Sequence, residues 1–510
     1  MSLAIVYSRA QLGIQAPLIT VETHLSNGLP SLSIVGLPET AVKESKDRVR
    51  SAILNSHFEF PQRRITINLA PADLPKEGGR YDLPIALGIL AASGQIPQEP
   101  LVQHECMGEL ALTGELRAVA GSLPAAIACS REQRRLLLPC DNANEAAFVK
   151  NINVLPAKHL LEVCAHLNGR QTITPHQFVA HTARALHHLD LCDVRGQESA
   201  KRALEIAAAG NHNLLMIGSP GTGKTMLASR MPGILPSMTE KEALQVAAVR
   251  SIASRSTQAI IVADTVRPFR NPHHTASSVA LVGGGSTPRP GEISLAHNGV
   301  LFLDELPEFH RKALEVMREP LESGEIIISR ASAQIMFPAR FQLIAAMNPC
   351  PCGYFGDREG RCRCSADQVR RYRDRISGPL LDRIDLHINV PSLKKGELQQ
   401  LRGGESSTIV RERVLKCREL QWQRNQGKTN NQLDSQGIEQ HCQLGRAEQQ
   451  LMEKAMEKLQ LSARAYHRIL KVARTIADLA QTEKITQQHI TEALSYRQLD
   501  RAIRREPAQV

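Results

Sequence analysis

The chain has 510 residues and a formal net charge of +11, a length that suits roughly three domains of about 150 residues each. A positive balance of this size favours an anionic partner, most often nucleic acid, although an acidic protein or an anionic lipid would also fit. Seven of the eleven cysteines lie singly, which argues against a secreted disulfide framework and for a reducing compartment.

Signals for export or membrane insertion are not found in the sequence. The first residues contain no basic region leading into an apolar core, as a signal peptide would. The apolar run at 83–92 is about half of the roughly 20 residues that a membrane-spanning helix needs. We therefore expect a cytoplasmic protein with no membrane partner.

Residues 1–167 have the pattern of an α/β domain, in which strand-like and helix-like runs alternate. The strand-like runs include 18–24, 64–69 and 135–138, and the helix-like runs include 39–55 and 82–92. The polar, histidine-containing stretch over 168–190 is typical of a linker.

Residues 191–392 form a second α/β unit. Short apolar runs, suited to a parallel sheet buried on both faces, lie at 213–217, 300–303, 341–346 and 386–390. Residues 393–510 follow as a polar stretch to 435 with at least one helix, and then a helical region. Its apolar residues recur at three-to-four spacing over 447–459, 463–479 and 487–496.

A phosphate-binding loop directly follows the run at 213–217. Its residues are Gly218, Ser219, Pro220, Gly221, Thr222, Gly223, Lys224 and Thr225, which fit the pattern G-x-x-x-x-G-K-[ST] between a strand and a helix. Glycines let successive N–H groups face one anion, and the helix adds its positive end. Lys224 can reach the β- and γ-phosphates of ATP, and the Thr225 hydroxyl can bind Mg²⁺.

Two carboxylates end the apolar run at 300–303. Beside a phosphate loop, Asp304 would hold Mg²⁺ through water or through Thr225, and Glu305 would orient or deprotonate the attacking water. Asn348 follows the run at 341–346 and could hold that water or sense the γ-phosphate, although an asparagine at a strand end is often only a turn former.

The interval between Thr225 and Asp304 is too long for one helix and one strand, so 264–294 is interpreted as an insertion. It carries adjacent histidines, His273 and His274, for which a structural role is favoured because neighbouring side chains seldom face one ion together. A helix at 311–322 and a hairpin from 325–330 and 333–337 are predicted after the acidic pair.

Phosphoryl transfer also needs cations that stabilise charge spreading onto the phosphate oxygens. Arg383, Arg464, Arg468 and Arg474 are available. Nothing local shows which of them acts, and solvation at the surface is the default for each.

Four cysteines form two C-x-C pairs, and they are Cys350, Cys352, Cys362 and Cys364. Four thiolates suit tetrahedral Zn²⁺ in a loop too small to have its own core; unliganded thiols or a redox pair are the alternative. Arginines beside aromatic residues suit contacts to DNA phosphates and bases; a merely solvated basic helix is the alternative. The DNA-contact residues that we consider are Arg330, Arg361, Arg363, Arg370 and Arg371.

Together these motifs resemble the AAA+ ATPases of the magnesium-chelatase-like branch, and the ComM/YifB family in particular, over nearly the whole chain. The distinctive runs are GLPETAVKESKDRVRSAILNS (36–56), NLAPADLPKEGGRYDLPIALGIL (68–90), FRNPHHTASSVALVGGG (269–285), AAMNPCPCGYFGD (345–357) and SARAYHRILKVARTIADL (462–479). The phosphate loop and LFLDE alone would indicate only a nucleotide hydrolase.

The resemblance implies a role for several residues. Arg383 looks like an arginine finger that reaches the nucleotide of a neighbouring subunit, and Arg464 like the sensor-2 arginine of a helical lid, with Arg468 a weaker alternative. Residues 193–197 look like the adenine-side segment, 264–294 like the helix-2 insert and 323–338 like the pre-sensor-1 hairpin. A finger that acts between subunits implies a ring, expected to be a hexamer.

The same resemblance implies a fold of three parts: an amino-terminal Lon-protease-like (S5-like) α/β domain, an AAA+ core with a parallel sheet, and a carboxyl-terminal α-helical lid. Proteolysis would need a serine nucleophile with a lysine. The stretch 75–83 contains Lys76 but no serine, so we expect this domain to be non-proteolytic.

The function implied is an ATP- and Mg²⁺-dependent DNA motor, a helicase or branch-migration enzyme that acts in recombination of incoming DNA during natural transformation. A magnesium-chelatase motor subunit that remodels a partner protein is the first alternative. An ATP-dependent protease is the second, and the missing serine disfavours it.

Overall fold

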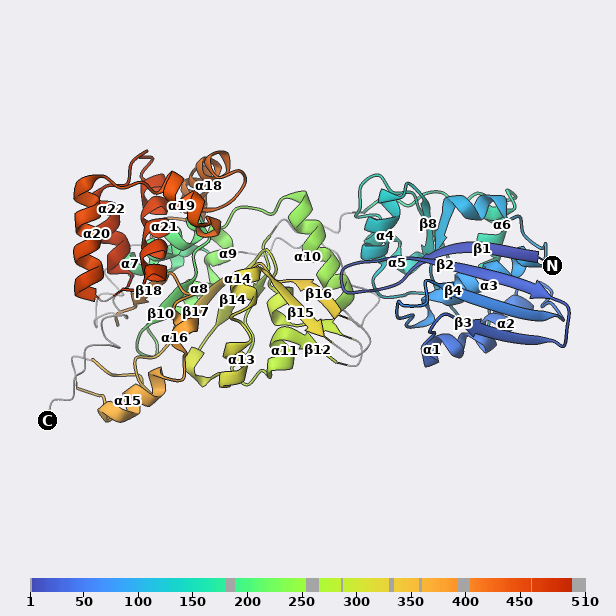
Figure 1. Ribbon diagram of the computed structural model, residues 1–510, viewed down its shortest axis with the longest axis horizontal. Helices are drawn as coiled ribbons and strands as arrows, with labels where there is room; N and C mark the ends of the chain where they lie inside the picture. The colour runs from blue at the N-terminus through green and yellow to red at the C-terminus, as the bar shows by residue number, and fades with distance from the viewer. Residues whose placement is uncertain are drawn as a thin grey trace.

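The computed structural model describes residues 2–179, 189–253, 266–285, 288–329, 334–356, 360–392, 404–459 and 461–497. Figure 1 shows the amino-terminal domain at one end of an elongated molecule, the phosphate-loop sheet in the middle and a bundle of carboxyl-terminal helices at the other end. Among the described residues, no helix is both long and apolar enough to cross a bilayer.

The amino-terminal domain is built on a seven-stranded mixed sheet in the order β3-β4-β2-β1-β5-β8-β9. These strands are β1 (Ser2–Arg9), β2 (Leu18–Ser26), β3 (Ser31–Val35), β4 (Arg64–Ala70), β5 (His104–Cys106), β8 (Arg135–Pro139) and β9 (Val154–Ala157), and β6 (Glu109–Leu110) and β7 (Leu116–Arg117) pair separately. The helices are α1 (Thr40–Lys43), α2 (Ser45–Asn55), α3 (Asp82–Ala92), α4 (Ser122–Arg131), α5 (Cys140–Ala146) and α6 (Leu160–Leu167). All residues of α3 are buried, as expected for a helix that is apolar on nearly every side.

The predicted strands at 18–24, 64–69 and 135–138 and the helix at 82–92 are confirmed, with small shifts at their ends. The single helix predicted over 39–55 is wrong, because α1 and α2 are separate. The buried Ser45 hydroxyl donates to the carbonyl oxygen of Val42 at 2.7 Å, an interaction of the kind that competes with helical hydrogen bonds.

The central unit contains a five-stranded sheet in the order β11-β14-β17-β10-β18, with every neighbouring pair parallel. Its strands are β10 (Leu214–Ile217), β11 (Phe269–Arg270), β14 (Val300–Leu303), β17 (Gln342–Met347) and β18 (Leu386–Asn389). The predicted parallel sheet is therefore confirmed. Parallel strands place their carboxyl ends at one edge, the edge at which ligands bind in open α/β sheets.

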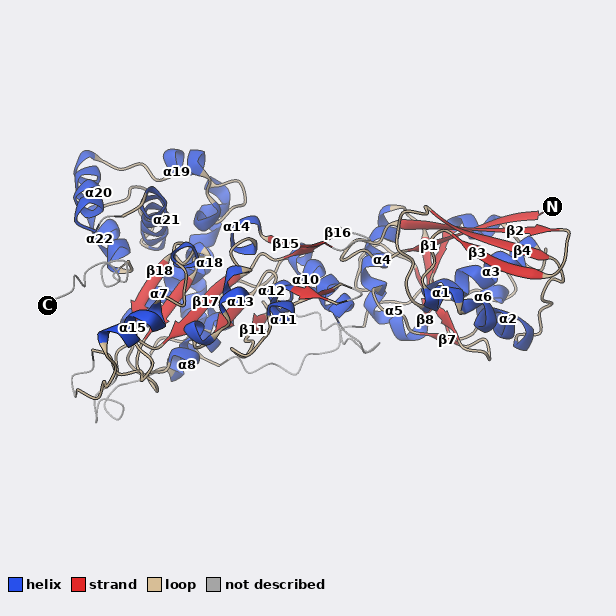
Figure 2. Ribbon diagram, turned by 60° about the horizontal axis from the view of Figure 1, so that its bottom comes forward, coloured by secondary structure: helices blue, strands red, loops and turns tan. Residues whose placement is uncertain are grey.

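Helices cover both faces of this sheet, as Figure 2 shows. The helices of the central unit are α7 (Glu198–Gly210), α8 (Lys224–Ser229), α9 (Met231–Ile234), α10 (Glu240–Ala253), α11 (Ser278–Val282), α12 (Glu292–Leu295), α13 (Arg311–Glu315), α14 (Pro320–Ser323), α15 (Ala366–Arg373) and α16 (Gly378–Leu381). The single helix predicted over 311–322 is wrong, because α13 and α14 are separate. Pro320 has no N–H and suits the first position of a new helix.

Two small hairpins project from the central unit. β12 (Gly283–Gly284) pairs with β13 (Arg289–Pro290), and β15 (Glu325–Ser329) pairs with β16 (Gln334–Pro338). The second confirms the predicted hairpin, and its alternate residues Ile326 and Ile328 are buried while Ile327 between them is exposed.

The amino-terminal domain contacts α10 and the β15–β16 hairpin. Lys150 pairs with Glu240 of α10 at 2.7 Å. Ala247 and Ala248 of α10 belong to the same apolar cluster as buried residues of the amino-terminal domain. Gly13 lies so close to Ile335 of β16 that an added Cβ would be 2.8 Å from that side chain. This end of the central unit therefore packs directly on the amino-terminal domain.

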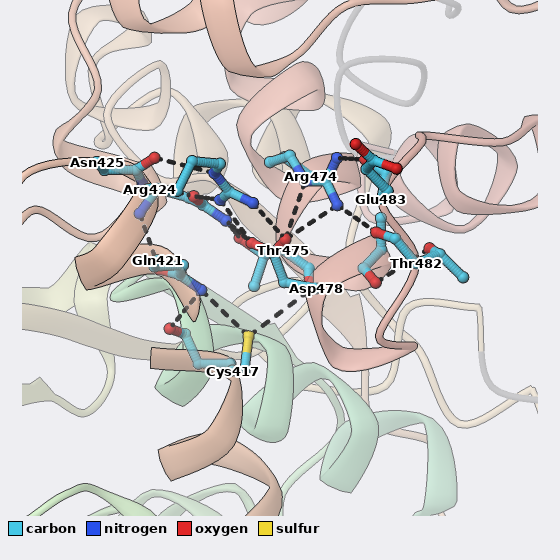
Figure 3. Close-up of polar contacts among 12 residues, drawn as sticks. Cys417, Gln421, Arg424, Asn425, Arg474, Thr475, Asp478, Thr482 and Glu483 are labelled. Carbon is cyan, nitrogen blue, oxygen red and sulfur yellow. Dashed lines mark hydrogen bonds and ion pairs between the residues drawn. The ribbon is translucent and has the colours of Figure 1, made fainter. Parts of the chain in front are cut away.

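The carboxyl-terminal lid consists of α18 (Ser407–Arg424), α19 (Ser435–His441), α20 (Arg446–Leu459), α21 (Ala463–Leu479) and α22 (Gln487–Ser495). The helices predicted at 447–459, 463–479 and 487–496 are thus confirmed. Figure 3 shows a buried polar network inside the lid, in which Asp478 accepts from Arg424 at 2.7 Å and from Arg474 at 2.9 Å. Arg474 also donates to the Thr482 carbonyl oxygen, so its guanidinium is bonded to other residues of the lid.

A buried carboxylate joins the lid to the sheet. Asp385 is 2% exposed; it accepts from Arg468 of α21 at 2.5 Å and from the backbone N–H of Asn213 at 2.9 Å. Burial alone would raise the pKa of Asp385, but Arg468, His212 and the Asn213 N–H hold it well below its usual range. The pair spans 83 positions of sequence, so it fixes a long-range contact.

We expect Asp385→Asn to destabilise the docking of the lid by about 3 kcal/mol, because breaking a buried pair leaves its partners uncompensated. The single tryptophan of the chain, Trp422 in α18, gives a fluorescence readout during urea unfolding. Because the pKa of Asp385 is lowered on folding, its stabilisation is complete above the unfolded pKa of about 4 and is lost as pH falls further. The difference from wild type should therefore be constant between about pH 8 and 5 and shrink only in stronger acid.

The matched control is Asp374→Asn, which breaks an exposed pair with Arg370 at 3.7 Å. Exposed pairs contribute about 0–1 kcal/mol, so this variant should unfold like wild type. Equal unfolding curves for the two variants would contradict the role given to Asp385.

Candidate nucleotide-binding site

The phosphate loop, the acidic pair and Asn348 all lie at the carboxyl edge of the central sheet. β10 ends at Ile217, before Gly218; β14 ends at Leu303, before the acidic pair; and β17 ends at Met347. Because these strands are parallel neighbours, the residues that follow them meet although they are far apart in the sequence.

The side chain of Lys224 folds back over the loop. Its Nζ donates to the carbonyl oxygens of Gly218 at 2.7 Å and Ser219 at 3.0 Å, and to Oδ1 of Asn348 at 3.2 Å. Burial lowers the pKa of Lys224, and the nearby carboxylates of Asp304 and Glu305 oppose that shift. These donors would be redirected to the β- and γ-phosphates of a bound nucleotide.

The loop has the backbone that anion binding needs. Gly221 and Gly223 have φ angles of +78° and +88°, values that glycine adopts without strain. The N–H groups of a turn in this conformation can converge on one anion, and α8 begins at Lys224 with its positive end toward the loop.

Thr225 and Asp304 form a pair of oxygen ligands. The Thr225 hydroxyl donates to Oδ2 of Asp304 at 2.6 Å. A hydroxyl and a carboxylate at this separation fit Mg²⁺, which takes hard oxygen ligands and one or two carboxylates beside nucleotide phosphates. Bound there, Mg²⁺ would neutralise charge on the phosphates.

Glu305 follows with a half-exposed carboxylate. Its backbone has a φ of +53°, and its N–H donates to Oδ1 of Asp304 at 3.0 Å. Oε2 of Glu305 lies 3.2 Å from Nδ1 of His274, whose ring is 4.1 Å from that of His273. The contact between His274 and Glu305 was not predicted, because no local sequence pattern relates the inserted segment to the acidic pair.

The segment at 193–197 borders the loop. Nε2 of Gln197 donates to the carbonyl oxygen of Thr222 at 3.3 Å and to that of Pro391 at 2.7 Å. Asp193 pairs with Arg230 at 3.4 Å. The residues expected on the adenine side are thus adjacent to the phosphate loop and to the end of β18.

Arg383 and Arg464 lie away from the phosphate loop. Both line a cavity of about 890 Å³ together with Trp422, Arg468 and Asn213. None of the phosphate-loop residues, all of which are described, lines this cavity. Arg383 is 7% exposed and pairs with Glu322 at 2.6 Å, whereas Arg464 is exposed.

The cavity faces the amino edge of the sheet. Arg468 is bonded to Asp385, which in turn bonds the N–H of Asn213 just before β10. The phosphate loop begins at Gly218, about 16 Å further along an extended chain at roughly 3.3 Å per residue. Within one chain, the two predicted nucleotide-sensing arginines and the phosphate loop therefore lie at opposite ends of the strands.

The four clustered cysteines come together. Their Sγ atoms all lie within 4.8 Å of one another, so the set could hold a metal ion. Cys350 is buried, and Cys352, Cys362 and Cys364 are partly buried. Backbone N–H groups of Arg363 and Tyr354 lower the pKa of Cys352 to about 6, which favours its thiolate form. At Cys362 and Cys364 a backbone hydrogen bond also lowers the pKa, but burial and the neighbouring thiols outweigh it and raise both values.

The predicted DNA-contact arginines cluster around this loop and α15. Arg361, Arg363, Arg370 and Arg371 are exposed, and the Arg361 guanidinium lies 4.6 Å from the centre of the Tyr354 ring. Arg330 lies outside the described residues. The same holds for 254–265 in and beside the predicted insertion and for part of the 168–190 linker.

Lys76 of the amino-terminal domain is fully buried. Its Nζ donates to the carbonyl oxygen of Pro71, and burial lowers its pKa. The amino group of Lys76 is therefore bonded to backbone, and the non-proteolytic character of this domain stays a prediction.

Comparisons with known proteins cover nearly the whole chain. The family "Subunit ChlI of Mg-chelatase" matches residues 21–142, "Magnesium chelatase, subunit ChlI" matches 190–398, and "Magnesium chelatase, subunit ChlI C-terminal" matches 404–497. The Magnesium-chelatase 38 kDa subunit of Cereibacter sphaeroides is 26% identical over 169 residues, 30% of this chain and 51% of that protein.

Two bacterial proteins are similar over their full length. Competence protein ComM of Haemophilus influenzae is 56% identical over 510 residues, 99% of each chain. The protein YifB of Escherichia coli K12 is 53% identical over 504 residues, 99% of this chain and 98% of that protein. The chain therefore belongs to the ComM/YifB family of magnesium-chelatase-like AAA+ proteins.

Proposed function

We propose that the protein is an ATPase that assembles into a ring, expected to be a hexamer, and moves on DNA. Lys224 would bind the β- and γ-phosphates, Thr225 and Asp304 would hold Mg²⁺, Glu305 would activate water, and Asn348 would position it. ATP bound with Mg²⁺ supplies a phosphoryl group whose developing charge these residues stabilise.

The proposal of a ring depends on one observation, the separation of Arg383 and Arg464 from the phosphate loop. Arg383 and Arg464 share a cavity that no phosphate-loop residue lines. An arginine at the amino edge of the sheet cannot reach a nucleotide at the carboxyl edge of the same chain. It can reach the nucleotide of a second copy, if copies contact head to tail and close into a ring.

In this arrangement Glu322 holds Arg383 while the neighbouring site is empty. The pair is 2.6 Å long, and the Glu322 side chain is 55% exposed. A neighbour's γ-phosphate would compete with Glu322 for the guanidinium. Arg464 is exposed on α21 and has no such partner among the ion pairs of the described residues, which suits a residue that contacts phosphate only at a subunit boundary.

Three observations support DNA as the substrate. The chain carries a net charge of +11, exposed arginines are concentrated on α15 and the cysteine loop, and a full-length relative is named a competence protein. We accordingly propose that the motor separates or branch-migrates DNA strands during recombination of incoming DNA in natural transformation.

The test measures strand displacement on forked and three-stranded DNA. We expect ATP-dependent displacement by the wild type and none by Lys224→Ala, because that variant loses the cation that holds the phosphates. Binding should weaken steeply with salt, since each phosphate contact releases counterions. The double variant Arg363→Ala/Arg371→Ala should reduce the slope of log affinity against log salt by about 2.

The control variant is Arg446→Ala on α20, which also removes the charge of an exposed arginine. This arginine lies on the lid, away from α15 in Figure 1, and its substitution should leave the slope unchanged. If no DNA structure stimulated ATP hydrolysis and a protein partner did, the protein would be a chelatase-type motor. Degradation of casein would instead support a protease.

A further inference from the structure

The four cysteine sulfur atoms all lie within 4.8 Å of one another, and three of them have separations suited to a tetrahedral metal site. Sγ of Cys350 lies 3.3 Å from Cys352 and 3.8 Å from Cys362, and Cys352 lies 3.7 Å from Cys362. Four sulfurs at about 2.3 Å from one Zn²⁺ stand about 3.8 Å apart at the corners of a tetrahedron. The set is closed, with no position left for a substrate, as in structural rather than catalytic zinc sites.

The cysteine loop is continuous with the nucleotide site. Asn348, whose Oδ1 accepts from Lys224 Nζ at 3.2 Å, precedes Cys350 by only two residues. A tight turn follows, in which the N–H of Gly353 donates to the carbonyl oxygen of Cys350 at 3.0 Å. The N–H of Phe355 donates to Sγ of Cys350 at 3.3 Å, so the turn is wrapped around one of the sulfurs.

This turn lies directly against the phosphate loop. A Cβ added to Gly353 would lie 2.5 Å from Cδ and 2.7 Å from Cγ of Pro220, and 3.8 Å from Cγ of Asn348. Pro220 is the third residue of the phosphate loop, and its ring fixes its φ angle. Gly353 therefore lies close against Pro220, and a shift of the cysteine turn toward the phosphate loop must move the proline.

We propose that Cys350, Cys352, Cys362 and Cys364 bind one Zn²⁺, and that this metal site holds the phosphate loop in its binding conformation through the contact of Gly353 with Pro220. Nucleotide affinity then depends on a metal that touches neither nucleotide nor Mg²⁺. The loop has too few apolar residues for a core of its own, so the metal supplies the order that positions Gly353. This inference rests on the proposed nucleotide site.

Two glycines of the same loop provide a matched pair of variants. Gly353 and Gly356 have φ angles of +84° and +79°, and an added Cβ at Gly356 would meet none of the described residues within 4 Å. Alanine thus imposes the same backbone strain at both positions, but a clash with Pro220 at only one. We expect Gly353→Ala to weaken binding of a fluorescent ATP analogue by about tenfold or more, as overpacking of a tight contact does, and Gly356→Ala to have no more than a twofold effect.

Both variants should keep one zinc per chain by atomic absorption, because neither removes a ligand. Equal affinities for the two variants would overturn the route through Pro220. Removal of zinc from the wild-type protein by a chelator should weaken binding of the same analogue, and added Zn²⁺ should restore it. Cys362→Ser should lose zinc and affinity together.

The outcomes separate this inference from the proposed function. Wild-type protein that carries zinc but binds no ATP analogue would refute the nucleotide site itself. Protein that binds the analogue equally well with and without zinc would overturn only the coupling. Iron in place of zinc, or no bound metal, would overturn the metal assignment.

Discussion

Glu305→Gln is expected to lower ATP turnover by about 10²- to 10³-fold while leaving nucleotide binding within a few-fold of wild type, as loss of a general base does. The amide has nearly the shape of the carboxylate but cannot accept the proton of the attacking water. The phosphate contacts of Lys224 and the pair formed by Thr225 and Asp304 remain. Turnover is measured by phosphate release, and binding by titration with a fluorescent ATP analogue.

Glu308→Gln is the matched control. Glu308 lies three residues further along the same segment, and its carboxylate pairs with Arg375 at 2.8 Å rather than facing the loop. It should retain full turnover. Wild-type rates in Glu305→Gln would exclude this residue as the base, and weak binding in that variant would instead give Glu305 a structural role.

Arg383→Ala is expected to lower turnover by about 10³-fold or more, the effect of removing an arginine finger. Affinity for ATP should change little in the isolated chain, because Arg383 lies at the sheet edge opposite the phosphate loop. Arg375→Ala is the control, since it removes an exposed arginine that pairs with Glu308.

Mixing the two inactive variants tests whether a site is shared. A copy with Arg383→Ala keeps its own Glu305, and a neighbouring Glu305→Gln copy supplies the missing arginine. With random assembly from equal amounts, up to about a quarter of the boundaries regain both groups. A mixture no more active than its components, under conditions in which the subunits exchange, would argue against shared sites.

Residues that follow parallel strands were predictable from the sequence. The loop at 218–225, the acidic pair and Asn348 each come after a short apolar run, and parallel strands bring such positions to one edge. Local patterns also located the β15–β16 hairpin and the long lid helices. They failed within 39–55 and 311–322, where Ser45 and Pro320 divide runs whose apolar spacing suggests one helix.

Contacts between distant elements could not be predicted in this way. The bond between Asp385 and Arg468 decides where α21 docks, and it is this docking that carries Arg464 to the far edge of the sheet. The approach of His274 to Glu305 likewise depends on how an inserted segment folds back. Neither pair has a signature in the spacing of its residues.

The lid and one face of the central sheet share a single apolar core. Leu214 and Phe302 of the sheet belong to the same cluster as Ile469 and Ile476 of α21. Separation of the lid from the sheet would expose these side chains to water at a free-energy cost of about 2 kcal/mol for each. We therefore expect the sheet and the lid to move as one rigid body. In the proposed ring, the motion that follows ATP hydrolysis would then be a rotation of whole subunits against one another, with the hinge at the boundaries between copies.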